Sequence, residues 1–319
     1  MKGRNLNKLF VFDIEKSEVV AEVFDAWKNK KKYVIQHLSG KRLDKWIKYA
    51  SEEVGIPFDK SALKENRYIN SILFKQGCIG ITTDDIPNNS VLLLLERFAK
   101  VFEQTYTRFL DLQKAEEQAR ESQIEAALER VRSRSMAMHN SEELLEVINV
   151  VSEQLQQLGM KFSNASFGIN TGSFDFDFWV AAPGIDHPFR IHLPYLDSPV
   201  FNRLKDAQIN EQSFFADSFN AIETKEWMQH LFANNDIAEF TPQTREYLLS
   251  KIGFVRSSVL LKNIILSIIN YEGIKYSNDE NDVYIRFANA FEQAYTRFLD
   301  LQRAEAQTRE AQIENALEK

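Results

Sequence analysis

Glycine and proline are scarce in this chain, at 11 and 7 of 319 residues. Because both residues mark turns and interrupt helices, their scarcity favours long regular elements over loops. Cysteine occurs once, at Cys78, which excludes an internal disulfide. No metal-ligand spacing surrounds Cys78, so we predict no metal site and a reducing compartment.

Long apolar runs are also missing. The longest, such as 91–95 and 264–269, fall far short of the roughly 20 residues that a membrane span needs. The basic residues 1–4 are not followed by the apolar stretch of a signal peptide. We therefore expect a cytoplasmic segment without membrane contact. A net charge of −7 argues against nucleic-acid binding, which normally requires a basic excess.

An internal repeat is the strongest signal in the sequence. Residues 97–129 recur 189 positions later as residues 286–318, and 25 of the 33 aligned residues are identical. Heptad bias alone could match Ala, Glu and Gln, but it would not produce a shared FEQ-x-YTRFLDLQ. The pattern indicates a duplication. Weaker matches extend it upstream and pair 12–24 with 189–201, Trp46 with Trp227, and Gly80-Ile81 with Gly273-Ile274.

The first copy starts only at the equivalent of about Phe189, and the second ends where its partner would continue into Arg130. Both ends therefore look cut, and we expect either a piece of a longer repeat array or an incomplete reading frame. The predicted organisation is a truncated domain at 1–95, a linker helix at 96–140, a complete domain at 141–280 and the start of a second linker helix at 281–319.

The complete copy alternates helical and strand-like patterns, which predicts an α+β fold with an antiparallel sheet flanked by helices. Phe174, Phe176 and Phe178 alternate with Asp175 and Asp177, the period of two of a half-buried strand. The expected elements are a helix from an N-cap at Ser141 to Leu158 that stops at Gly159, strands at 161–170, 174–182 and 188–193, helices at 200–207, 222–232 and 242–252, and strands at 257–269 and 271–276.

The linker contains no Gly or Pro from 90 to 138, and its apolar residues step by three and four. At about 1.5 Å per residue, 40 helical residues span about 60 Å, too long to pack on one domain of this size. We expect a parallel coiled coil in a homodimer. The alternative is a helix folded back on its own domain. The predicted interface residues are Phe98, Phe102, Phe109, Leu112, Ile124, Leu128 and Val131.

Residues 102–144, FEQTYTRFLDLQKAEEQARESQIEAALERVRSRSMAMHNSEEL, resemble the linker that precedes and separates sensor domains in multidomain sensor histidine kinases of Bacteroidetes-type bacteria. The order of elements in the globular parts resembles that of GAF-like sensor domains. This resemblance implies two GAF-like domains that form a regulatory input region. A small ligand or a partner would change the packing of the domains, and the helices would pass that change to an output domain.

Few residues suggest a catalytic or metal-binding role. His139, followed by Glu142, superficially resembles a phospho-acceptor box, but a helix boundary explains it and no Gly-rich nucleotide motif is present. The pairs Asp84-Asp85 and Asp279-Glu280 could bind a hard cation, although acidic helix N-termini account for them more simply. We therefore predict no catalytic residue.

A ligand pocket in the second copy would combine aromatic walls with polar groups. The candidate residues are Trp179, Arg190, His192 and Phe214, with an ordinary core as the alternative for the aromatic ones. No ligand or cofactor can be named from them. Three hypotheses follow: a non-catalytic sensory region, a histidine kinase fragment with part of its activity, and a structural scaffold without a ligand.

Overall fold

The computed structural model describes residues 9–58, 64–140, 143–169, 174–185 and 187–317. They form an α+β protein with antiparallel sheets and two long helices. The chain divides into two compact units, Met1–Gln118 and Ala119–Lys319, which we call the first unit and the second unit.

The first unit is a three-stranded antiparallel sheet, in the order β1-β2-β3, with helices on both faces. Along β2, Ile69 packs toward Val19 of the first helix, while Ile72 packs against Leu95 of the last. The elements are α1 (Glu18–Lys28), β1 (Tyr33–Ser39), α2 (Gly40–Lys48), a π-helix (Tyr49–Glu53), β2 (Asn66–Phe74), β3 (Gly77–Thr83) and α3 (Asn89–Met136), which ends in the second unit.

The second unit is built on a six-stranded antiparallel sheet in the order β6-β5-β4-β9-β8-β7. Its elements are α4 (Leu144–Gln157), β4 (Asn164–Ile169), β5 (Phe176–Ala181), β6 (Phe189–Leu193), α5 (Pro199–Ile209), β7 (Phe214–Asn220), α6 (Ala221–Asn234), α7 (Pro242–Leu249), β8 (Gly253–Leu260), β9 (Ile264–Asn270) and α8 (Asn278–Leu317).

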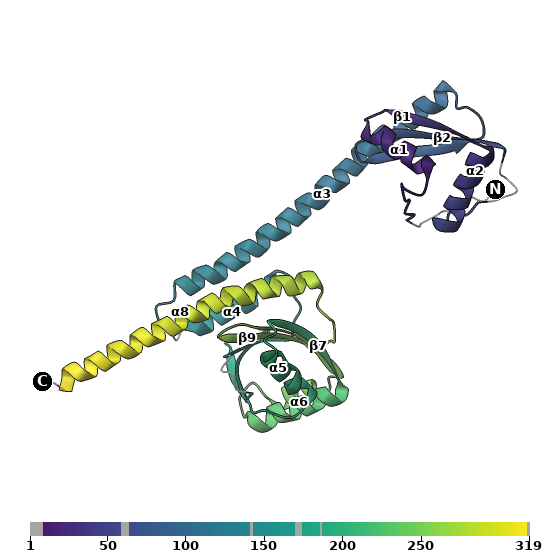
Figure 1. Cartoon of the computed structure of the whole chain (residues 1–319). Helices are drawn as coiled ribbons and strands as arrows, with labels where there is room; N and C mark the ends of the chain where they lie inside the picture. The colour runs from purple at the N-terminus through teal and green to yellow at the C-terminus, as the bar shows by residue number, and fades with distance from the viewer. Residues whose placement is uncertain (1–8, 59–63, 141–142, 170–173, 186, 318–319) are drawn as a thin grey trace. The chain divides into compact units, whose positions relative to one another are not determined.

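Helices α4 and α8 cover one face of this sheet, and α5 and α6 lie on the other (Figure 1). Every residue of β9 is buried because the strand contributes to two cores. Ile264, Leu266 and Ile268 belong to the core with α4 and α8, whereas Ile265 and Ile269 belong to the core with α5 and α6. The sequence of a strand that is buried on both faces is a continuous apolar run and does not alternate between apolar and polar residues.

Several expected elements are confirmed, including the stop at Gly159, which adopts a left-handed φ of 83° after α4. Ser141, the expected N-cap, lies outside the described residues. The expected strand at 257–269 is two strands, β8 and β9, joined by a turn. The expected strand at 271–276 is wrong, because these residues form a turn and an irregular segment before α8. Strand β7 was not expected.

The first unit repeats the second half of the second unit. Its order α1-β1-α2-β2-β3-α3 matches α5-β7-α6-β8-β9-α8, and its strand order β1-β2-β3 matches β7-β8-β9. Helices α1 and α5 are both 11 residues long and follow Ser17 and Ser198. This equivalence corrects the upstream alignment. Val19 corresponds to Val200, which lies four residues after the position that the expected pairing of 12–24 with 189–201 assigns to it. Gly80 lies inside β3 and Gly273 after β9, so that pairing is wrong.

Candidate functional site

The second unit contains a cavity of about 480 Å³ on the sheet face that carries α5 and α6. A capping box between Asn220 and Glu223 fixes the start of α6, which places Trp227 one turn further along in the cavity wall. The wall comes from β4, β5, β6, α6, α7 and the end of β9. Its main residues are Phe162, Asn164, Val180, Phe189, Ile191, Trp227, Phe240, Tyr247, Ile269 and Tyr271.

Polar groups gather at one end of this cavity. Asn164 Nδ2 donates to the Tyr271 hydroxyl at 3.2 Å, and the Tyr271 backbone N–H donates to Ser163 Oγ at 3.0 Å. Burial raises the pKa of Tyr271 to about 12, although the contacts with Asn164 and Trp227 oppose the shift. The Trp227 indole N–H is buried without a hydrogen bond of good geometry.

The charge of the cavity is low. Glu239 is the only charged residue among the described residues that line it, and they include no Lys, Arg or His. An anionic ligand would thus enter without a counter-charge, at a high cost in desolvation. The wall suits a small, neutral, largely aromatic molecule that exchanges hydrogen bonds with Asn164 or Tyr271.

The four residues predicted to bind a ligand do not line this cavity. In β5, Phe176, Phe178 and Val180 belong to the core beside α5 and α6, so Trp179 points to the opposite face and packs with the core of α4 and α8. Phe214 packs with that same core. Strand alternation directs these side chains away from the cavity, and their predicted role in ligand binding stays a prediction.

Arg190 and His192 do come together, two residues apart on the same face of β6. Asp177 Oδ1 lies 3.2 Å from Arg190 Nη2 and 3.1 Å from His192 Nδ1, and all three side chains are exposed. Trp179 and Arg190 are directly opposite in the β5–β6 register. The group is a surface ion pair on the sheet.

The buried ion pair of the second unit was not expected from the sequence. Arg256 of β8 faces Asp217 of β7 in register, and Arg256 Nη2 lies 2.6 Å from Asp217 Oδ2. The same Nη2 donates to the Val200 carbonyl of α5 at 3.1 Å. In the first unit, Gln36 stands at the position of Asp217 and itself donates to the Val19 carbonyl of α1 at 3.0 Å.

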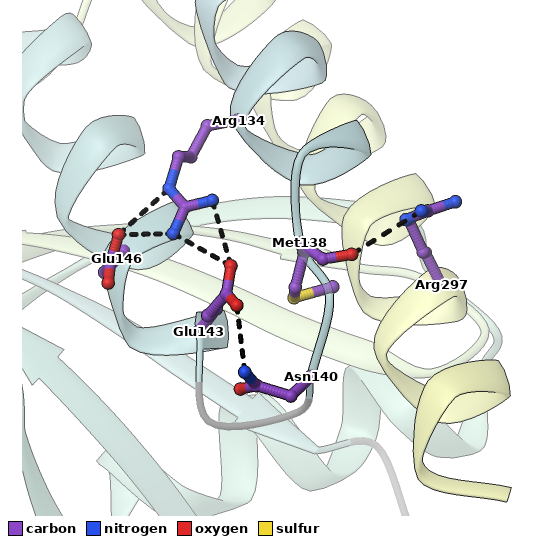
Figure 2. A network of polar contacts seen from close by, with 6 residues as sticks. All are labelled: Arg134, Met138, Asn140, Glu143, Glu146 and Arg297. Atoms are coloured by element: carbon purple, nitrogen blue, oxygen red, sulfur yellow. Dashed lines mark hydrogen bonds and ion pairs between the residues drawn. The ribbon is translucent and has the colours of Figure 1, made fainter. Parts of the chain in front are cut away.

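His139 is exposed in the turn between α3 and α4, beside a polar cluster. Figure 2 shows the Arg134 guanidinium between the carboxylates of Glu143 and Glu146. Arg297 of α8 reaches the carbonyl of Met138 in the same turn, at 3.5 Å. These contacts join α3, α4 and α8 into one helical layer.

The acidic pairs have structural partners. Asp84 lies 3.0 Å from Lys64, and Asp279 and Glu280 occupy the first turn of α8 as expected. Glu280 accepts from the Ser277 backbone N–H at 2.8 Å, as in an N-terminal cap. Over the described residues, no three His, Cys, Asp or Glu side chains are grouped to hold a metal ion. In the same part of the chain, no helix combines the length and apolar character needed to cross a membrane.

The seven predicted coiled-coil residues divide into two groups. Phe98, Phe102, Phe109 and Leu112 are exposed on α3, so their pairing with a second chain stays a prediction. Ile124, Leu128 and Val131 are instead buried in one cluster with α4 and α8 of their own chain. For these three, the apolar face of α8 provides an intramolecular partner, as in the alternative of a helix folded back on its own domain.

Comparison with known proteins gives a distant likeness among solved structures. No protein-family model matches the chain, and no curated protein matches its sequence. Among solved structures, the chain is similar to the phycoerythrobilin-bound GAF domain from a cyanobacterial phytochrome, with a TM-score of 0.36 and 11% sequence identity. The match covers 55% of this chain and 95% of that domain.

Proposed function

We propose that this chain is a non-catalytic, GAF-like sensory region of a cytoplasmic bacterial signalling protein. A small ligand binds in the cavity of the second unit, and the sheet passes the change to the helical layer of α3, α4 and α8. Self-association along the exposed part of α3 belongs to the same proposal.

One observation carries this proposal: two central strands contact the cavity and the helical layer at once. In β4, Asn164 lines the cavity, while Phe167 packs on Phe291 of α8 with ring centroids 4.9 Å apart. In β9, Ile269 lines the cavity, while Ile268 packs into the core with α4 and α8. A ligand that shifts these strands therefore alters the packing of α8 against the sheet, since close-packed cores transmit small displacements.

The ligand class follows from the wall of the cavity. A neutral aromatic molecule of modest size fits the Phe, Trp and Tyr side chains and the low charge. A thermal-shift screen of the whole chain with neutral aromatic heterocycles tests this. At about 100 times its Kd, a ligand stabilises the unit that binds it by about 2.7 kcal/mol.

A matched pair of variants locates the binding. Ala182→Trp places an indole at the cavity wall, whereas Ile222→Trp adds one on the outer side of α6. We expect Ala182→Trp to keep its circular dichroism spectrum but lose the ligand-induced shift, and Ile222→Trp to keep both. An unchanged shift in Ala182→Trp would place the ligand elsewhere. A screen without any hit favours the scaffold hypothesis.

A further inference from the structure

Tyr271 carries a polar group into the apolar wall of the cavity in the second unit. The residue directly follows β9, and its side chain is only 8% exposed. Its backbone N–H donates to Ser163 Oγ at 3.0 Å, next to Asn164, the first residue of β4. The Tyr271 hydroxyl is therefore held where the two central strands of the proposed relay meet the cavity.

The protein presents only donors to this hydroxyl. Asn164 Nδ2 donates to the Tyr271 oxygen at 3.2 Å, and Ser166 Oγ donates to Asn164 Oδ1 at 3.3 Å, which turns the amide N–H toward Tyr271. Burial is the largest influence on the pKa of Tyr271 and raises it, whereas the contacts with Asn164 and Trp227 lower it. An indole N–H can only donate, so Trp227 also faces the hydroxyl oxygen as a donor.

The hydroxyl proton of Tyr271 has no acceptor in the part of the chain that the structure describes. There, its one hydrogen bond of good geometry is the bond that it accepts from Asn164. Donors that contact the oxygen polarise the O–H group and strengthen it as a donor in turn. Because a buried donor without an acceptor costs free energy, the site favours a molecule that supplies one.

We propose that the Tyr271 hydroxyl selects the ligand by donating a hydrogen bond to it. The ligand is then a neutral aromatic molecule with an acceptor atom that bears no hydrogen, such as a pyridine-type ring nitrogen or a carbonyl oxygen. This inference rests on the proposed function, because it concerns the same cavity. A molecule of the same shape without an acceptor leaves the hydroxyl proton unpaired and binds at least about tenfold more weakly.

Two probes of nearly equal shape test this selection on the full chain. Quinoline and naphthalene are both uncharged near neutral pH, and the ring nitrogen of quinoline is the acceptor that naphthalene lacks. Affinities come from NMR titrations of protein with isotope-labelled tyrosine phenolic carbons. We expect quinoline to bind at least about tenfold more tightly than naphthalene. At equal occupancy, quinoline should also change the Tyr271 resonance more, because only quinoline accepts from the hydroxyl.

A matched pair of variants assigns the effect to one hydroxyl. Tyr271→Phe removes the donor and nearly keeps the shape of the wall, so it should lower the quinoline affinity at least about tenfold and leave the naphthalene affinity nearly unchanged. Tyr276→Phe is the control, since Tyr276 packs against the core of α4 and α8 and its hydroxyl is also buried without a partner. This control variant should keep the preference for quinoline.

The outcomes separate this inference from the proposed function. Equal affinities of the two probes for the unmodified chain overturn the role of Tyr271, and so does a preference for quinoline that survives Tyr271→Phe. Either result leaves a ligand-binding cavity in place. Absence of binding by both probes overturns the inference as well, and together with a screen without any hit it also overturns the proposed function.

Discussion

Helices α3 and α8 carry nearly the same sequence but have different environments. In α8 the aromatic face is buried in one core with α4 and the end of α3, and the Phe291 ring packs at a tilt against Phe167 of the sheet. In α3 the equivalent Phe102 contacts only Phe74 and Tyr106 in ring pairs and stays half exposed. An apolar stripe therefore specifies that a helix will bury one face, but the surrounding elements decide against what.

The largest expected effect comes from truncating the two equivalent phenylalanines. Phe291→Ala should cost about 3 to 5 kcal/mol in the free energy of unfolding of the second unit, because it leaves a cavity in a closed core. Phe102→Ala should cost no more than about 0.5 kcal/mol, as at other exposed positions. Urea unfolding followed by fluorescence measures both, since Trp27 and Trp46 report on the first unit, and Trp179 and Trp227 on the second. Equal losses of stability in the two variants would contradict this difference between α3 and α8.

The buried polar contacts of the two units give a second test of this comparison. Asp217→Ala leaves Arg256 buried without its carboxylate, which should destabilise the second unit by about 3 kcal/mol. The equivalent Gln36→Leu in the first unit removes a buried hydrogen bond to the Val19 carbonyl and a partly buried one to the Glu22 carboxylate, but it leaves no buried charge without a partner and should cost about 2 kcal/mol. The same urea titrations decide between these values. A larger loss in Gln36→Leu than in Asp217→Ala would contradict the assignment.

The smallest effect concerns pH and is confined to the second unit. The pKa of Tyr271 rises from 10.0 to about 12 on burial, because the buried site disfavours the phenolate. Its contribution is fully present below pH 10 and is lost as pH rises from 10 to about 12, a difference of roughly 2 to 3 kcal/mol. Tyr271→Phe should reduce the loss of stability of the second unit over this range, as followed by denaturation at fixed pH values. An unchanged pH dependence would count against a buried, neutral Tyr271.

Much of the fold could be predicted because the sequence signals are local. The alternation around Phe176 and Phe178 marks β5, and Gly159 marks the end of α4. Strand β7 was missed because Phe214 and Phe215 are adjacent, which blurs a period of two. The break between β8 and β9 falls at Lys262-Asn263, but the apolar residues on both sides, which belong to strands buried on two faces, make the segment resemble one strand.

The candidate site was less accessible to prediction. Its walls combine Trp227 from a helix with Phe240 from a loop and Tyr271 from a segment after the last strand, and no spacing in the sequence links them. The residues that were chosen, Trp179 and Arg190 among them, lie on a strand pair of the right domain but on the opposite face. Their side-chain direction depends on a register that one sequence does not reveal.

The sheet of the first unit has a practical consequence for anyone who handles this chain. Strand β3 pairs only with β2 among the described strands, whereas its equivalent β9 is enclosed between β4 and β8. A row of backbone donors and acceptors along β3 is thus open to strands from other molecules, and such rows nucleate β-rich aggregates. We expect losses on concentration to begin at this strand, so a lysine at Ile81, which is 37% exposed near its end, is the natural first change for improving solubility.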